Sequence, residues 1–245
     1  MHRYKLIVEY DGTPFCGWQR QSGVLTVQQC LEEAVQPLTK DLVLISGAGR
    51  TDTGVHALGQ VAHFETEKNL DAFRIQECMN AHLVDYPISV LSVEEVDEKF
   101  HSRFSAIERF YIYKIVNRRS KLALDINRAW KVLRPLDVKR MDNIAQILVG
   151  KHDFSSFRAK GCQAVSPVKT LNSISVERFC DQVVVKLAAK SFLYHQVRNI
   201  VGSLIKVGIG EWTEDKFQAV FESKDRSQAA ATAPACGLYF WKVVY

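Results

Sequence analysis

The order in which two kinds of periodic segment follow one another constrains the fold of this chain most strongly. Residues 3–12 alternate polar and apolar side chains and end at Asp-Gly, which indicates a strand followed by a turn. A capping-box pattern at 26–29 opens an apolar-periodic helix, which we expect to end near Pro37. The other elements expected in the first half are strands at 41–49, 55–65 and 88–96 and a helix near 71–82.

The second half repeats this theme. The elements expected there are a strand at 108–117, a helix at 137–150, a hairpin of strands at 173–179 and 182–192, a helix at 194–208 and a strand at 237–245. An α+β fold with two successive units that meet near residue 105 accounts for this order. We therefore predict an N-terminal subdomain at 1–105 and a C-terminal subdomain at 106–245.

The composition is that of a globular protein rather than a disordered or membrane-spanning one. Hydrophobic residues make up 47% of the 245 residues and charged residues 24%. The first residues contain no apolar core of a signal peptide, and no apolar run approaches the ~18 residues that cross a bilayer. The six cysteines show no Cys-x-x-Cys spacing, so we expect reduced thiols in a cytoplasmic protein without a disulfide framework or membrane partner.

Charge is distributed unevenly along the chain. Residues 1–99 hold 8 Lys/Arg against 15 Asp/Glu, whereas residues 100–140 hold 11 against 3 and residues 141–245 hold 13 against 9. The basic middle stretch also interleaves aromatic residues with its arginines and lysines, a mixture that suits RNA or DNA. A solvated strand edge explains the same stretch equally well, so charge alone leaves both interpretations open.

The segment 47–65, GAGRTDTGVHALGQVAHFE, holds the densest group of residues that are typical of catalytic sites. This segment does not match either of two nucleotide-binding motifs that its glycines suggest. A dinucleotide fingerprint requires a third glycine where Asp52 stands, and a carboxylate there would repel a pyrophosphate. A P-loop requires Lys-Ser/Thr after its last glycine, whereas Val-His follows Gly54.

Two further catalytic classes fail on the same segment. The tripeptide Asp-Thr-Gly at 52–54 is typical of aspartic proteases, but these need two carboxylates that share a proton, and the chain has no second such tripeptide. The triplet His-Phe-Glu at 63–65 suggests a zinc deaminase, but residues 234–236 do not complete the required Pro-Cys-x-x-Cys. We therefore predict no metal site, and we interpret His63 as a strand histidine that a neighbouring group satisfies.

What remains is Asp52 beside Arg50 in a glycine-flanked loop. The ordinary explanation is a loop carboxylate that caps a turn or pairs with the arginine. The surrounding string, however, resembles the Gly-Arg-Thr-Asp-x-Gly-Val-His-Ala signature of the tRNA pseudouridine synthase A family. Further blocks resemble that family in order along nearly the whole chain: EYDGTPFCGWQRQ, FHSRFSAIERFYIYKI, HDFSSFRAKGC, FLYHQVRNIVGSLIKVG and AAATAPACGLYFWKVVY.

The resemblance implies isomerisation of uridine to pseudouridine at positions 38–40 in the anticodon stem-loop of tRNA. On this sequence it makes Asp52 the catalytic nucleophile and places Tyr111 against the target base. It pairs Arg198 with Asp52 and makes Leu238 the apolar floor of the pocket. It also implies two RRM-like subdomains with mainly antiparallel sheets joined around a central basic cleft, and a homodimer whose two subunits contact one tRNA, without a cofactor or metal.

Two positions depart from the commoner family pattern: Thr53, where alanine is usual, and Phe110, where polar residues are frequent. Arg50 is our candidate for holding the backbone of the extruded nucleotide, because a guanidinium can bind a phosphate through two hydrogen bonds. The alternative function is a tRNA-binding module that has lost catalysis. The presence of Asp52, Tyr111 and Arg198 together argues against that loss, since binding alone does not require the trio.

Overall fold

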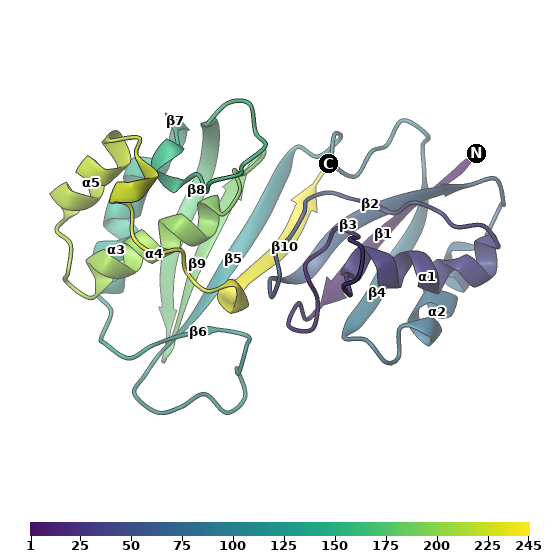
Figure 1. The fold of residues 1–245 in the computed structure, drawn as a ribbon, viewed down its shortest axis with the longest axis horizontal. Helices are drawn as coiled ribbons and strands as arrows, with labels where there is room; N and C mark the ends of the chain where they lie inside the picture. The colour runs from purple at the N-terminus through teal and green to yellow at the C-terminus, as the bar shows by residue number, and fades with distance from the viewer. The chain divides into compact units, whose positions relative to one another are not determined.

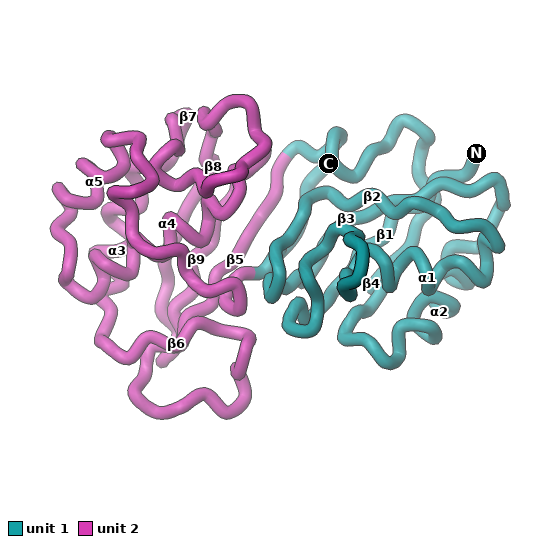
Figure 2. The backbone as a smooth tube through the Cα atoms, viewed as in Figure 1, with its two compact units in different colours: residues 1–107, 239–245 teal, residues 108–238 magenta.

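The chain forms two compact units in a computed structural model that describes residues 1–245. The first unit comprises residues 1–107 together with residues 239–245, and the second comprises residues 108–238 (Figure 2). Residues 239–245 therefore return to the unit that the first part of the chain builds.

The first unit contains a mainly antiparallel sheet in the strand order β4-β1-β3-β10 (Figure 1). Its strands are β1 (His2–Tyr10), the short β2 (Ser46–Gly47), β3 (His56–Thr66), β4 (Ile88–Val96) and β10 (Leu238–Val244). β3 pairs antiparallel with β1 and β2, whereas β10 joins β3 in parallel, with Tyr239 beside His56. Four side chains of β1 that share one face, at positions 4, 6, 8 and 10, are buried in the core.

Two helices cover this face of the first sheet, namely α1 (Val27–Thr39) and α2 (Ala72–His82). Thr26 caps α1 by accepting a hydrogen bond from the backbone N–H of Gln29, as the sequence predicted. The helix ends at Thr39, two residues beyond Pro37, near which its end was expected. The proline removes one backbone donor, but the N–H of Lys40 bonds to the Gln36 carbonyl and closes the last turn in a left-handed conformation.

The expected strand at 41–49 was also largely wrong. Only Ser46–Gly47 pairs with β3, opposite His63 and Ala62. Leu42 and Leu44 are exposed whereas Val43 and Ile45 are buried. Side chains of this segment therefore alternate between buried and exposed, although residues 41–45 pair with no strand. Alternation shows which side chains are buried but does not show which backbone is paired.

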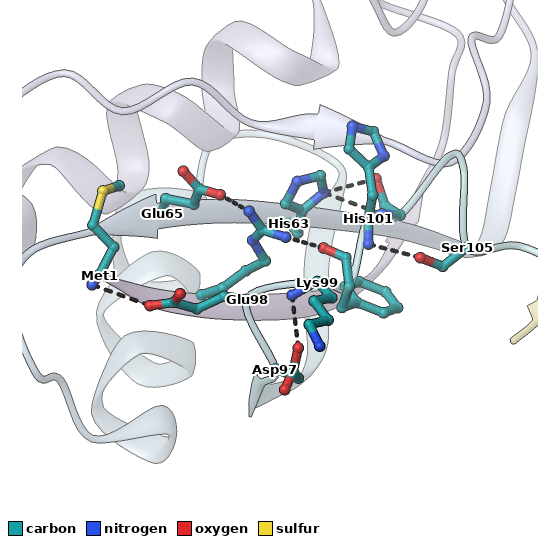
Figure 3. Close-up of polar contacts among 11 residues, drawn as sticks. Met1, His63, Glu65, Asp97, Glu98, Lys99, His101 and Ser105 are labelled. Atoms are coloured by element: carbon teal, nitrogen blue, oxygen red, sulfur yellow. Dashed lines mark hydrogen bonds and ion pairs between the residues drawn. The ribbon is translucent and has the colours of Figure 1, made fainter.

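The segment 97–105 lies against the other face of the first sheet, where His101 and Ser105 lie near His63 (Figure 3). The C-terminal end of the chain reaches the same segment, because the Tyr245 hydroxyl donates to the Ser102 carbonyl over 2.7 Å. His63 is buried and its Nδ1 lies 2.9 Å from the Ser102 hydroxyl, which confirms the interpretation of this residue as a satisfied strand histidine. Burial is the main reason that its pKa is lowered to about 4, and the neighbouring His101 and Arg3 lower it further. On the same face of the sheet, the Lys5 ammonium lies over the ring of Tyr245.

The second unit contains an antiparallel sheet in the order β5-β9-β8-β7, with β6 added in parallel to β5 (Figure 1). Its strands are β5 (Glu108–Asn117), β6 (Trp130–Val132), β7 (Gly150–Asp153), β8 (Val168–Phe179) and β9 (Gln182–Ala189). The predicted hairpin is confirmed, and Cys180 makes its turn in the left-handed region with φ of 55°. β8 begins five residues before the predicted strand.

The helices of the second unit are α3 (Val138–Ala145), α4 (Gln196–Gly208) and α5 (Glu214–Glu222). The helix predicted at 137–150 ends early, because a 3₁₀ turn at Gln146–Leu148 follows it and Gly150, with φ of 109°, begins β7. Short 3₁₀ turns also occur at Ser155–Phe157, Arg226–Gln228 and Ala235–Gly237. The sequence patterns did not reveal α5, which Thr213 caps.

Both units thus combine a mainly antiparallel sheet with helices, which confirms the predicted α+β class. α3 contacts β8 and α4, and α5 contacts α4. None of the helices is long and apolar enough to cross a membrane.

Candidate active site

Asp52 lies in the loop between β2 and β3 of the first unit. The loop turns where the N–H of Val55 donates to the Asp52 carbonyl over 3.1 Å, and Gly54 adopts a φ of 75° at this turn. The Asp52 side chain is half-buried and that of Arg50 is exposed. The carboxylate and the guanidinium therefore stand on one short loop, and both have access to a ligand.

Hydrogen bonds from distant parts of the first unit hold the residues on both sides of Arg50. The Gln60 side-chain amide donates to the Gly49 carbonyl over 2.7 Å. The N–H of Trp18 donates to the Thr51 carbonyl over 3.1 Å, and the hydroxyls of Thr51 and Tyr10 share a buried hydrogen bond of 2.8 Å. The position of Asp52 thus depends on groups that lie far from it in the sequence.

Gly17 allows the N-terminal segment to approach this loop closely. A Cβ atom at position 17 would lie 2.5 Å from the Thr51 carbonyl oxygen and 3.1 Å from the carbonyl carbon of Asp52. Any other residue would push the two segments apart. The opening block of the sequence, with Tyr10, Gly17 and Trp18, therefore serves as the support of the Asp52 loop, a role that sequence patterns did not show.

Tyr111 lies on β5 of the second unit, opposite Leu187 of β9. Its ring makes an edge-to-face contact with Phe192 at a centroid distance of 5.0 Å. Tyr113 on the same face of the strand is completely buried, whereas Tyr111 is half-buried. Tyr111 is therefore not a fully enclosed core residue.

Arg198 lies in the first turn of α4, also in the second unit. Its Nε donates to the Ala233 carbonyl over 2.8 Å, and its own carbonyl accepts from the N–H of Ala233 over 3.2 Å. Its Nη1 lies 3.2 Å from Nε2 of His195, which precedes the helix in a left-handed conformation with φ of 59°. These contacts orient the half-buried guanidinium from two sides.

The segment that follows Ala233 is hydrogen-bonded to β5. The Tyr113 hydroxyl donates to the Pro234 carbonyl over 2.7 Å. A Cβ atom at Gly237 would lie 2.6 Å from the Tyr113 ring, so only glycine fits there. Leu238 comes next and is 6% exposed, which makes it a buried apolar residue at the start of β10.

The structure therefore gathers the predicted residues in two groups. Arg50 and Asp52 share a loop of the first unit, and Tyr111, Arg198 and Leu238 belong to the second. Within the second group, the segment 233–238 links Arg198 to Leu238 and to the strand of Tyr111. No group of three or more His, Cys, Asp or Glu side chains is arranged to hold a metal ion, and all six cysteines are free.

Comparison with known proteins defines the class of this molecule. The family model described as tRNA pseudouridine synthase matches residues 6–105 and 144–245. These ranges include Arg50, Asp52, Arg198 and Leu238, whereas Tyr111 lies between them. The chain belongs to the tRNA pseudouridine synthase family.

Full-length relatives narrow the comparison within this family. The chain is 52% identical over 245 residues to the tRNA pseudouridine synthase A of Afipia carboxidovorans, with all of both chains covered. It is 53% identical over 243 residues to the enzyme of the same name from Rhodospirillum rubrum, with 99% of this chain and 87% of the relative covered. It is 49% identical over 245 residues to that of Xanthobacter autotrophicus, again with both chains fully covered.

Proposed function

We propose that this protein isomerises uridine to pseudouridine at positions 38–40 in the anticodon stem-loop of tRNA, with Asp52 as the nucleophile. The family gives the class of reaction, the isomerisation of uridine in tRNA, and shows that the protein is an enzyme. The observation that supports Asp52 is its place on a loop that hydrogen bonds fix on both sides of Arg50, with the carboxylate half-buried rather than enclosed.

The reaction requires a group that can act on a stable glycosidic bond. The bond between uracil and ribose breaks, the base turns, and a new bond forms through carbon 5 while the hydrogen on carbon 5 leaves. A carboxylate held in one orientation can serve as the nucleophile of such a sequence without help from a metal. In this proposal Asp52 has that role.

Arg198 is proposed to pair with Asp52 when the uridine is bound. The guanidinium is already oriented by Ala233 and His195, so it loses little conformational freedom when it accepts a carboxylate partner. The ion pair would hold the Asp52 carboxylate in its anionic form and fix its direction.

Tyr111 and Leu238 are proposed to hold the uracil while it is detached from the ribose. The half-buried Tyr111 ring offers a face on which a base can stack, and stacking tolerates different orientations of the base. Leu238 would provide an apolar contact without a hydrogen bond that opposes rotation. Together they would retain the base and still allow it to turn.

The target uridine must leave the stacked helix before any of these groups can reach it, which costs a few kcal/mol. Arg50 is proposed to hold the phosphate backbone of the extruded nucleotide, since its side chain is exposed on the same loop as Asp52. The basic residues of the second unit would bind the stem through charge and shape. We also propose a cytoplasmic homodimer that binds one tRNA through both subunits.

The test is tritium release from tRNA labelled at carbon 5 of its uracils, with the natural protein compared with Asp52→Asn. Formation of the new bond must expel this hydrogen, whereas binding alone does not. We expect release by the natural protein and none above background by the variant, with unchanged tRNA affinity. Release that survives in Asp52→Asn would remove Asp52 as the nucleophile. No release by the natural protein, with binding intact, would favour the non-catalytic tRNA-binding module.

The position of the modified uridines is tested separately. tRNAs in which single uridines at positions 38, 39 or 40 are replaced by cytidine should lose the corresponding share of tritium release. Unchanged release from a tRNA without uridine at any of the three positions would contradict the assignment to the anticodon stem-loop.

A further inference from the structure

A buried tyrosine in the first unit touches the Asp52 loop without access to a substrate. Tyr10 ends β1 and is 3% exposed, and its ring packs beside Trp18 at a centroid distance of 6.2 Å. Its hydroxyl lies 2.8 Å from the hydroxyl of Thr51, which is itself 8% exposed. The contact therefore joins the core of the unit to the residue immediately before Asp52.

The Tyr10 hydroxyl is suited to hold a position and not to move a proton. Burial raises its pKa well above the ordinary value, although hydrogen bonds with Thr51 and Gln60 act in the opposite direction. It stays neutral at physiological pH and can always take part in the hydrogen bond. The same Gln60 side chain donates to the Gly49 carbonyl, so one small polar cluster reaches the loop on both sides of Arg50.

We propose that Tyr10 is a positioning residue for the isomerisation, which acts by holding Thr51 and thereby aiming the Asp52 carboxylate. This inference rests on the proposed role of Asp52. Thr51 and Asp52 are consecutive, so a rotation of the Thr51 backbone moves the carboxylate directly. A displacement of about 1 Å at a reacting group can lower a rate ~100-fold.

The same strand provides a matched control for this proposal. Tyr4 also lies on β1 and is fully buried, and its hydroxyl donates to the Leu70 carbonyl over 2.8 Å and accepts from the N–H of Leu70. Tyr4→Phe therefore removes a buried phenol hydroxyl from the same strand and the same face as Tyr10→Phe does. Only the latter change touches the Asp52 loop.

The experiment measures three quantities for each variant: the single-turnover rate of tritium release, the Kd for tRNA and the Tm. For Tyr10→Phe we expect the rate to fall about 10- to 100-fold, with the Kd within about twofold of the natural value. For Tyr4→Phe we expect a similar loss of Tm but a rate within about twofold of the natural rate. Equal effects of the two variants on the rate would overturn the proposal.

Substitutions at Thr51 test the proposed route and do not depend on the folding of Tyr10→Phe. Thr51→Val removes the hydroxyl and should lower the rate as Tyr10→Phe does, whereas Thr51→Ser keeps it and should retain most activity. The double variant Tyr10→Phe/Thr51→Val should be no slower than either single variant, because both remove one shared bond. Losses that multiply, or a Thr51→Ser variant as slow as Thr51→Val, would overturn the route through this hydrogen bond.

Asp52→Asn is measured in the same series to keep the two proposals apart. Its rate decides whether Asp52 is the nucleophile. The difference between Tyr10→Phe and Tyr4→Phe decides whether Tyr10 positions the loop. A fully active Asp52→Asn beside a slow Tyr10→Phe would reject the nucleophile and retain Tyr10 as the support of whichever loop group reacts.

Discussion

The two units share a construction but carry opposite charge. Each has a mainly antiparallel sheet with helices, and in each a buried tyrosine of the first strand bonds to a segment that carries candidate site residues: Tyr10 to Thr51, and Tyr113 to Pro234. Yet the first unit holds 10 Lys/Arg against 15 Asp/Glu, whereas the second holds 22 against 12.

This difference separates two tasks that a tRNA-modifying enzyme must perform. A polyanion binds mainly through basic side chains, and these are concentrated in the second unit. The first unit, which carries the proposed nucleophile Asp52, has a net negative charge. We infer that the second unit provides most of the affinity for tRNA, and the first provides the group that reacts.

The largest expected effect concerns Arg198, the arginine that we propose the second unit contributes to the chemistry. Arg198→Lys keeps the charge, but an ammonium cannot both donate a hydrogen bond to the Ala233 carbonyl and make a bidentate contact with a carboxylate. We expect the single-turnover rate of tritium release to fall about 100- to 1,000-fold, as for loss of an electrostatic group at a reacting centre. A rate unchanged within about threefold would show that the second unit serves binding alone.

The second effect concerns acid stability of the first unit. His63 has its pKa lowered from the ordinary 6.5 to about 4, so between these values the unfolded chain binds a proton that the folded chain does not. The stability is therefore fully present above pH 6.5 and is lost as the pH falls toward 4, by at most about 3 kcal/mol.

Urea unfolding at pH 7 and at pH 4.5 checks this expectation. His63→Asn should be less stable than the natural protein at pH 7, because it loses buried contacts, but it should lose less stability between the two pH values. An equal loss in both proteins would show that other groups control the acid response.

The third effect tests the division of charge. Arg119→Ala/Lys121→Ala removes two exposed basic residues of the second unit, and Arg74→Ala/Lys99→Ala removes two from the first. We expect the first pair to weaken tRNA binding about 10-fold at low salt and to reduce the slope of log affinity against log salt by about 1 to 2. The second pair should change affinity less than about twofold. Equal losses would contradict the assignment of affinity to the second unit.

The smallest effect sharpens the comparison between the two tyrosines. Tyr113→Phe leaves the Pro234 carbonyl without its donor, and we expect a loss of about 1 kcal/mol in the free energy of unfolding, measured in urea. If the tyrosines have equivalent roles, this variant should also slow tritium release, because Pro234 follows the residue that orients Arg198. A rate at the natural level would restrict the positioning role to Tyr10.

The sequence predicted most of the regular elements because their periodicity is strong. It could not predict that 41–44 lacks a strand partner or that Tyr10 reaches Thr51, because both depend on residues more than ten positions apart. Asp52, Tyr111 and Arg198 came from motifs and not from periodic patterns. Tyr10 looked like any core residue of an alternating strand, since its neighbours at alternate positions are equally buried.

The return of residues 239–245 to the first unit has a consequence for biosynthesis. β10 pairs with β3 at His56 and Ala57, and the Tyr239 ring stacks on the His56 imidazole at 4.7 Å, immediately after the Asp52 loop. During translation these residues emerge only after the whole of the second unit. The last residues made are still inside the ribosome when synthesis ends, so β10 can pair with β3 only after the chain has been released. A chain truncated before residue 239 would hold every residue of the second unit but would lack the strand that pairs with β3 beside the Asp52 loop.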